Sequence, residues 1–156
     1  MFRIERATAK DADAVLELLV QVNRVHAEGR PDLFRLGTKY NREELLSIFS
    51  DDLSPVFVYK NEDGQVLGHA FCIFMTHPND NILTDIKTLY IDDICVDEAA
   101  RGQHVGAALY AHVTKFAKKS GCYNITLNVW NCNPGAMKFY ESLGLVPYKV
   151  GMEQIL

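Results

Sequence analysis

The part of the chain that restricts the fold most strongly is the stretch from residue 84 to residue 130. A β-rich run, TDIKTLYIDDICV, ends at Val96, and an alternating run, YNITLNVW, occupies residues 123–130. Between them apolar residues recur at helical spacing, at Leu109, Val113, Phe116 and Ala117. A strand, a helix and a second strand in this order form a crossover unit with parallel strands. The stretch therefore predicts an α/β domain.

The first half of the chain predicts one strand, two helices and a hairpin. FRIERAT at residues 2–8 reads as a short strand, and Thr8 with Asp11 forms a variant capping box before a helix that Gly29 and Pro31 break. NREELLSIFS predicts a second helix. PVFVYK and GQVLGHAFCIFM predict two strands, and NEDG between them suits a hairpin turn.

The end of the chain predicts one more helix and more strand. Asn133 is the expected N-cap, Pro134 the first helical residue, and Gly144 the stop. LVPYKVGMEQIL, residues 145–156, predicts a last strand or pair of strands. The order is β-α-α-β-β-β-α-β-α-β, in a single α/β (α+β) domain over residues 1–156. We expect a mixed central sheet of six to seven strands flanked by about four helices.

Composition excludes several classes of protein. The chain has 156 residues, of which 48% are hydrophobic and 23% are charged. This composition is typical neither of a disordered chain nor of a membrane protein. A net charge of −4 argues against nucleic-acid binding. The first residues lack the apolar run of a secretory signal, so we expect a cytoplasmic protein with reduced cysteines. The four cysteines form no Cys-x-x-Cys pair and the histidines show no ligand spacing, so no metal site is expected.

The loop after Val96 is a candidate anion site. Gly102 and Gly106 bracket Gln103, His104 and Val105 just before the predicted helix. Unpaired backbone N–H groups and the helix dipole at such a junction attract phosphate. The alternative is a tight turn that needs glycine for its backbone angles. The loop alone leaves the two interpretations open.

The loop and a second block together resemble a known family. The loop runs Arg101-Gly102-Gln103-His104-Val105-Gly106, and the second block has Asn133, then Tyr140 and Gly144. In this pattern the chain resembles the GNAT superfamily of acyl-CoA-dependent N-acetyltransferases, whose loop reads Arg/Gln-x-x-Gly-x-Gly/Ala. His104 stands where that loop has its first glycine. A register based on Gln103, Gly106 and Ala108 is the alternative, but it lies two residues further from the strand end.

The resemblance implies acetyl-CoA as cofactor, released as coenzyme A, and a role for each matching residue. The strand residues that would pair with the pantetheine arm are Ile94, Cys95 and Val96. The residues that would hold the pyrophosphate are Arg101, Gly102, Gln103, His104, Val105, Gly106 and Ala107. Asn133 would hydrogen bond the arm, and Tyr140 would protonate the leaving thiolate. Taken singly, Asn133 is also explained as a helix cap and Tyr140 as a core aromatic, and we expect Trp130 and Phe116 in the core.

Two carboxylates are candidates for the general base. Asp92 and Asp93 lie in an apolar strand run, where carboxylates are uncommon unless paired or functional. Strand alternation predicts opposite faces for them, with Asp92 on the face of Ile94 and Val96. Asp92 also matches the glutamate position of diamine acetyltransferases in the resembled superfamily, so Asp92 is the expected base, directly or through water. The alternative for Asp92 is an ion pair with a nearby lysine or arginine.

The acceptor is expected to be a primary amine of a small molecule or peptide. The candidate acceptor contacts are His26, Arg30, Asp32, Phe34 and Asp93. Acidic residues expected near the site, including Asp85 and Glu98, favour a cationic amine such as a polyamine, an aminoglycoside or a basic peptide. Neither nucleic acid nor membrane is an expected partner, and a homodimer is left open.

The function expected from the sequence is acetyl transfer from acetyl-CoA by direct attack of the amine in a ternary complex. One alternative is a non-catalytic acyl-CoA-binding module of the same fold, which would not need Tyr140. A nucleotide-binding α/β protein is a weaker alternative, because the chain lacks Gly-x-Gly-x-x-Gly and Gly-Lys-Ser/Thr loops.

Overall fold

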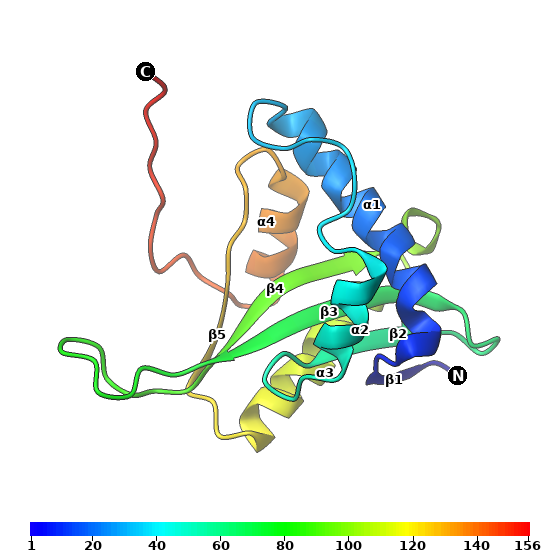
Figure 1. Ribbon diagram of the computed structural model, residues 1–156, viewed down its shortest axis with the longest axis horizontal. Coiled ribbons are helices and arrows are strands. Elements are labelled where there is room, and N and C mark those ends of the chain that lie inside the picture. Colours follow the sequence, from blue (N-terminus) through cyan, green and yellow to red (C-terminus); the bar gives the residue numbers. More distant parts are fainter.

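The computed structural model describes residues 1–156 and contains one five-stranded sheet in the order β1-β2-β3-β4-β5 (Figure 1). The strands are β1 (Arg3–Arg6), β2 (Val56–Lys60), β3 (Val66–Met75), β4 (Thr88–Val96) and β5 (Asn124–Leu127). The α-helices are α1 (Ala12–Gly29), α2 (Arg42–Phe49), α3 (Val105–Lys119) and α4 (Pro134–Ser142). β1 to β4 pair antiparallel, and β4 pairs parallel with β5, as the crossover predicts.

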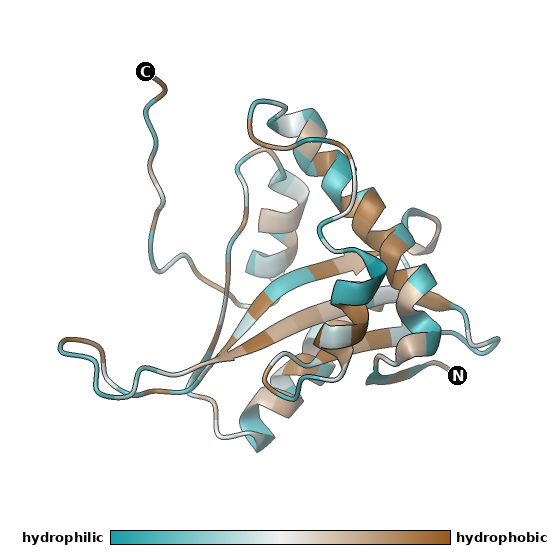
Figure 2. Ribbon diagram, in the orientation of Figure 1, coloured by the Kyte–Doolittle hydropathy of each residue, from teal (hydrophilic) through white to brown (hydrophobic).

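Helices cover both faces of the sheet and create two hydrophobic clusters. On one face α3 packs through Val105, Leu109 and Val113 against β2, β3 and β4. On the other face α1 and α2 pack through Val15, Leu19 and Leu45 against β2 and β3. Hydrophobic residues are accordingly concentrated in the strands and on α1 (Figure 2). Cys72 and Cys95 are buried, and all four cysteines are free thiols.

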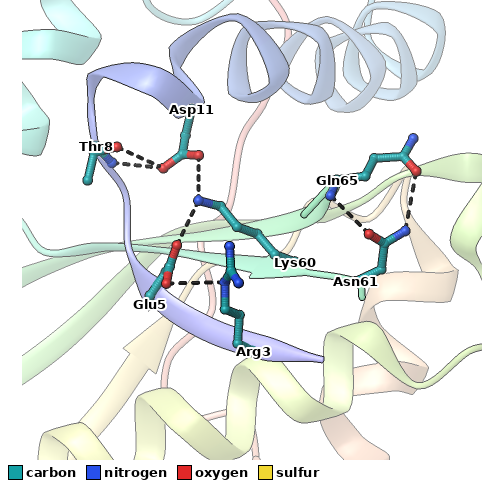
Figure 3. Close-up of polar contacts among 7 residues, drawn as sticks. All are labelled: Arg3, Glu5, Thr8, Asp11, Lys60, Asn61 and Gln65. Carbon is teal, nitrogen blue, oxygen red and sulfur yellow. Dashed lines mark hydrogen bonds and ion pairs between the residues drawn. The ribbon is translucent and has the colours of Figure 1, made fainter. Parts of the chain in front are cut away.

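A charged network fixes the start of α1 to the sheet (Figure 3). The Lys60 ammonium lies 2.7 Å from a Glu5 oxygen and 2.9 Å from a carboxylate oxygen of the buried Asp11. The other Asp11 oxygen accepts a hydrogen bond from the Thr8 backbone, which confirms the predicted capping box. The ion pair compensates the burial of Asp11 and connects the helix start to β2.

The prediction of six to seven strands is wrong, because the sheet has five. The one or two strands expected at residues 145–156 are absent. Residues 145–156 carry no strand, and Leu145 makes their one intrachain backbone hydrogen bond, to the Tyr140 carbonyl. They leave the sheet as an extended segment that ends at the C-terminus (Figure 1). A strand needs a paired neighbour to satisfy its backbone groups, and within one chain this segment has none. The four α-helices and the preceding order of elements agree with the prediction. None of the helices has the length and apolar character required to cross a lipid bilayer.

Candidate active site

The site begins where β4 and β5 separate. The two strands pair from Thr88 with Asn124 to Ile91 with Leu127 and no further, whereas β4 stays paired with β3 as far as Val96. The chain after β5 diverges from β4 toward the start of α4 (Figure 1). The edge of β4 that faces this split therefore has no strand partner at Ile94–Val96, the residues predicted to pair with an extended ligand arm. Such an edge can add a strand-like ligand through main-chain hydrogen bonds.

The predicted loop lies at the open end of the split and presents a group of free backbone donors. After a short 3-10 turn at Glu98–Ala100, α3 begins at Val105. Unpartnered N–H groups belong to Gly102, His104, Val105, Gly106 and Ala107. No acidic residue lies in the first turn of α3. Clustered free N–H groups at a helix N-terminus form an anion-binding concavity, so the geometry fits the pyrophosphate of an acyl-CoA.

His104 adopts the backbone conformation of the glycine it replaces. Its φ of 61° and ψ of 22° are left-handed, and Gly102 has a φ of 83°. Histidine is among the side chains that tolerate this region better than most. His104 therefore does not adopt the right-handed α conformation of the helix that follows it.

Gly106 permits close packing at the same junction. A β-carbon built on Gly106 would lie 3.0 Å from Cζ of Phe139 in α4 and 3.5 Å from Cγ2 of Val96. The glycine therefore allows α3 to approach both α4 and the end of β4. A larger residue would disturb this packing whether or not phosphate binds there.

Tyr140 and Asn133 lie on the α4 side of the split. Asn133 is the N-cap of α4, with Oδ1 accepting a hydrogen bond of 3.2 Å from the Ala136 N–H, which leaves the amide NH₂ free for a ligand. Burial raises the pKa of the Tyr140 hydroxyl, and the negative potentials of Asp93 and Cys95 raise it further. Tyr140 thus keeps its proton well above neutral pH, as a proton donor must.

The two aspartates of β4 have different partners. Oδ2 of Asp92 lies 2.8 Å from the Lys39 ammonium and accepts a 3.0 Å hydrogen bond from the Tyr40 hydroxyl. Asp92 thereby holds the connection between α1 and α2, which is the ion-pair alternative considered for it. Oδ2 of Asp93 lies 2.6 Å from Nε2 of the fully buried His69. Nδ1 of His69 is buried without a partner, so the contact of Nε2 with Asp93 is the hydrogen bond that orients the ring.

The expectation that the aspartates face opposite sides of the sheet is wrong. A bulge shifts the β3–β4 register, so that Phe71 pairs with Asp93 and Cys72 with Ile91. Asp92 is the extra residue. A bulge interrupts the alternation of side chains, and both carboxylates contact groups on the α1–α2 face. Ile94 and Val96 pack on the α3 face instead, so Asp92 does not share their side of the sheet.

The candidate acceptor residues gather at the end of α1. The His26 and Phe34 rings lie 5.1 Å apart, and Phe34 meets Trp130 edge-on, also at 5.1 Å. Burial lowers the pKa of His26, with Asp93 opposing and Lys39 adding to the shift. Trp130 is 42% exposed and is not the core residue we expected, because it lies on the chain leaving β5.

The other residues expected near the acceptor differ in their surroundings: Arg30 and Asp32 form a salt bridge with each other, and Asp85 lies away from the site. Arg30 forms salt bridges with Asp32 at 2.8 Å and with Glu153 at 2.5 Å. Asp85 accepts a 3.0 Å hydrogen bond from the His77 N–H in the loop between β3 and β4, which extends away from the split (Figure 1). Asp85 therefore adds nothing to the acidity of the site. Phe116 packs at the margin of the α3 cluster, as expected for a core residue.

Sequence reasoning missed three residues around the aspartates, namely His69, Lys39 and Tyr40. The sequence indicates only that the histidines lack metal-ligand spacing, whereas His69 is the buried partner of Asp93. One signal was present. A histidine within the apolar run GHAFCIF needs a polar partner, and the neighbouring strand contains Asp93.

Comparisons with known proteins agree with this geometry. A model of the Acetyltransferase (GNAT) family matches residues 13–145. A probable glucosamine 6-phosphate N-acetyltransferase 2 of Oryza sativa subsp. japonica is 33% identical over 66 residues, 42% of this chain and 38% of that protein. A thialysine N-epsilon-acetyltransferase of Bos taurus is 34% identical over 58 residues, 37% of this chain and 34% of that protein. The chain thus matches little more than a third of the length of these two curated relatives.

One solved structure is similar over almost the whole chain. A mutant of the BH1408 protein from Bacillus halodurans is 30% identical and covers 99% of both chains, with a TM-score of 0.95. Its likeness extends from the N-terminal strand into the extended C-terminal segment.

Proposed function

Since the chain belongs to the Acetyltransferase (GNAT) family, we propose that it transfers an acetyl group from acetyl-CoA to the primary amine of a small molecule. The observation that carries this proposal is the combination of an unpaired β4 edge at Ile94–Val96 with free N–H groups at the start of α3. The edge suits an extended arm, and the donors suit its pyrophosphate. Tyr140 lies across the split, on α4.

The chain's own groups can supply the proton transfers of this reaction. When bound, acetyl-CoA supplies the acetyl group as a thioester, whose carbonyl carbon is attacked by the amine lone pair while the carbon–sulfur bond breaks. Tyr140 donates its proton to the departing sulfur. Asp93, oriented by His69, accepts the proton that the amine loses, directly or through water. The sequence favoured Asp92 as the base, whereas the contacts of Asp92 with Lys39 and Tyr40 support a positioning role.

The acceptor is proposed to be a small amine, as in the relatives named for glucosamine 6-phosphate and thialysine. Arg30 and Lys39 beside the site are both paired with carboxylates. These pairings reduce the positive potential available for a phosphate on the acceptor and support the predicted preference for a cationic amine. A panel of thialysine, a polyamine, an aminoglycoside, glucosamine 6-phosphate and a basic peptide, assayed for coenzyme A thiol release, tests the proposal. No release with any of them would favour the non-catalytic acyl-CoA-binding alternative.

Tyr140→Phe separates the two functions, because the ring stays and only the hydroxyl is lost. If Tyr140 is the general acid, kcat should fall by roughly 10²–10⁴ while the KM for acetyl-CoA changes far less. Because the pKa of Tyr140 is raised above its ordinary 10.0, the wild-type rate should rise with pH as the amine deprotonates, without a decline near pH 10. Tyr123→Phe, at an exposed tyrosine after α3, is the matched control. Wild-type turnover in Tyr140→Phe would remove Tyr140 from the mechanism.

A further inference from the structure

Three aromatic rings from separate parts of the chain meet at the end of α1. His26 lies on α1, Phe34 on the connection between α1 and α2, and Trp130 on the connection between β5 and α4. The centroids of His26 and Phe34 lie 5.1 Å apart, and the same distance separates those of Phe34 and Trp130. We call these three residues the aromatic cluster. None of them takes part in the proton transfers of the proposed reaction.

The aromatic cluster is open to solvent and lies outside the core. Trp130 is 42% exposed, and His26 and Phe34 are only partly buried. None of the three belongs to either of the hydrophobic clusters that hold the helices on the sheet. A tryptophan ring carries a large apolar surface that usually packs in a core or an interface. In this protein part of that surface remains available to a ligand.

The angle between two of the rings suits a positively charged ligand group. The planes of Phe34 and Trp130 meet at 86°, so one ring stands edge-on against the other. Two rings at nearly a right angle form a corner in which a small group can contact both π faces. An ammonium group is attracted to such faces, and most strongly to that of tryptophan. The corner is therefore a candidate site for a cation.

The aromatic cluster also lies within electrostatic reach of the proposed base. Burial lowers the pKa of His26, and the negative potential of Asp93 partly opposes this shift. Because the effect of burial is the larger one, the His26 ring is mostly neutral at pH 7 and does not repel a cation. An acceptor whose reacting amine lies at Asp93 can therefore extend its other end over the cluster.

The salt bridges near the cluster favour a cationic end over a neutral one. Arg30, at the end of α1, is shared by two carboxylates, those of Asp32 and Glu153. Of the two aspartates on β4, only Asp92 is paired with a lysine. Carboxylates therefore outnumber the cations with which they are paired on both sides of the cluster. This excess of negative charge attracts a second cation, whereas a neutral hydrocarbon chain would gain nothing from it.

We propose that the acceptor is a diamine or polyamine whose second, non-reacting ammonium binds in the corner between Phe34 and Trp130. This inference rests on the proposed function, because it places the reacting amine at Asp93. Phe34 and Trp130 are then specificity-determining residues, which select the acceptor by the charge at its far end. A phosphate at that end, as in glucosamine 6-phosphate, is repelled both by the π faces and by the surrounding carboxylates.

Tryptophan fluorescence tests the proposal without turnover. Trp130 is the one tryptophan of the chain, so its emission reports directly on the aromatic cluster. With saturating coenzyme A in place of acetyl-CoA, putrescine should change this emission in a saturable way. n-Pentylamine carries a methyl group in place of the second ammonium and should bind at least about fivefold more weakly. Cadaverine and n-hexylamine repeat the comparison with a chain that is one methylene longer.

Kinetics of ring-deleting variants test which residues provide the selectivity. Phe34→Leu keeps an apolar side chain but removes a π face. It should lower the ratio of kcat/KM for putrescine to that for n-pentylamine by at least about threefold, mainly through the KM for putrescine, and Trp130→Leu should lower it further. Phe2→Leu is the matched control, because Phe2 stacks on Tyr59 at 4.7 Å beside the opposite edge of the sheet. It should leave the ratio unchanged.

Three results would overturn the proposal. They are equal affinity for the diamine and the monoamine in both pairs, an emission that neither diamine changes, and a wild-type ratio in Phe34→Leu. The fluorescence comparison uses the unmodified protein, so it remains decisive even if Trp130→Leu fails to fold. If no amine is acetylated, the proposed function fails. If monoamines are acetylated as efficiently as diamines, only this inference fails.

Discussion

Asp93 is the carboxylate of the site whose partner is itself buried. His69 is inaccessible to solvent and fixes Oδ2 of Asp93 at 2.6 Å, while Asp92 is held by Lys39 and Tyr40. Asp93→Asn should therefore lower kcat at neutral pH, with a deficit that shrinks at high pH as the amine deprotonates without help. Asp92→Asn should act mainly on the KM for the amine, because it releases the connection between α1 and α2. The pH–rate profiles of both variants measure this difference.

The opposite result would support Asp92 as the general base, as the sequence predicts. A larger, pH-dependent loss of kcat in Asp92→Asn would mean that Asp92 acts on the amine despite its ion pair. His69→Gln provides a second check on Asp93. It should reproduce part of the Asp93→Asn effect on the pH profile if His69 positions the carboxylate.

His104 gives a second test at the scale of one residue. Its left-handed backbone is unfavourable for most side chains, by about 1 kcal/mol. His104→Gly should therefore leave the free energy of unfolding unchanged or raise it. Acetyl-CoA affinity should persist, because the proposed contacts with its pyrophosphate come from backbone N–H groups. Gln103→Gly, at a neighbour without positive φ, should instead destabilise by up to about 1 kcal/mol. Urea unfolding and calorimetric titration measure both quantities. Loss of acetyl-CoA affinity in His104→Gly would show that the imidazole itself binds the ligand.

The packing of α3 on the sheet depends on one glycine of β3. A β-carbon at Gly68 would lie 2.9 Å from the Cys95 carbonyl oxygen and 3.0 Å from Cγ1 of Val105. The Cys95 carbonyl oxygen belongs to the backbone, so moving it away would disturb the β3–β4 pairing. Gly68→Ala should therefore lower the free energy of unfolding by about 1–3 kcal/mol, measured by urea denaturation.

Gly135 in α4 offers the matched control. A β-carbon there would meet nothing closer than Oδ1 of Asn133 at 3.9 Å. Gly135→Ala should be neutral or stabilise by up to about 1 kcal/mol, since alanine favours the helix. Equal stability of Gly68→Ala and wild type would contradict the close approach of α3 to β3.

At the scale of elements, local patterns predicted most of the fold. The capping box at Thr8 and Asp11, the cap at Asn133 and the glycine turn before β3 depend on neighbours in sequence, and all three are present. The bulge at Asp92 was not predictable, because it is a property of the β3–β4 pair and not of either strand. The last strand or pair of strands predicted for residues 145–156 is absent, because within the chain the segment has no neighbouring strand with which its backbone pairs.

The same distinction between local patterns and long-range contacts explains which parts of the candidate site the sequence could indicate. The loop and the Asn133–Tyr140 block are contiguous patterns, and the sequence located them. The partners of Asp92 and Asp93 come from residues 24 to 53 positions away, and their contacts exist only after the sheet and the α1–α2 connection have formed. Acidic residues expected near the site illustrate the same limit, because Asp85 lies in a loop that extends away from it.

At the scale of the whole molecule, the proposed site lies between two parts of the chain that make few other contacts with each other. The β4 edge and the start of α3 belong to the well-packed body, whereas Tyr140 and Asn133 lie on α4, which has no buried residue. A ligand held by both sides would therefore tie α4 to the body. Binding should stabilise the fold as a whole, because the unfolded chain has no such site.

The unfolding free energy with and without acetyl-CoA tests the central claim most directly. At a ligand concentration of one hundred times the dissociation constant, stabilisation should be about 2.7 kcal/mol, with a corresponding rise in Tm. Coenzyme A should stabilise similarly, because the free N–H groups at the start of α3 and the open β4 edge would hold the parts it shares with acetyl-CoA. A Tm unmoved by saturating acetyl-CoA and by coenzyme A would contradict the assignment of this split as an acyl-CoA site.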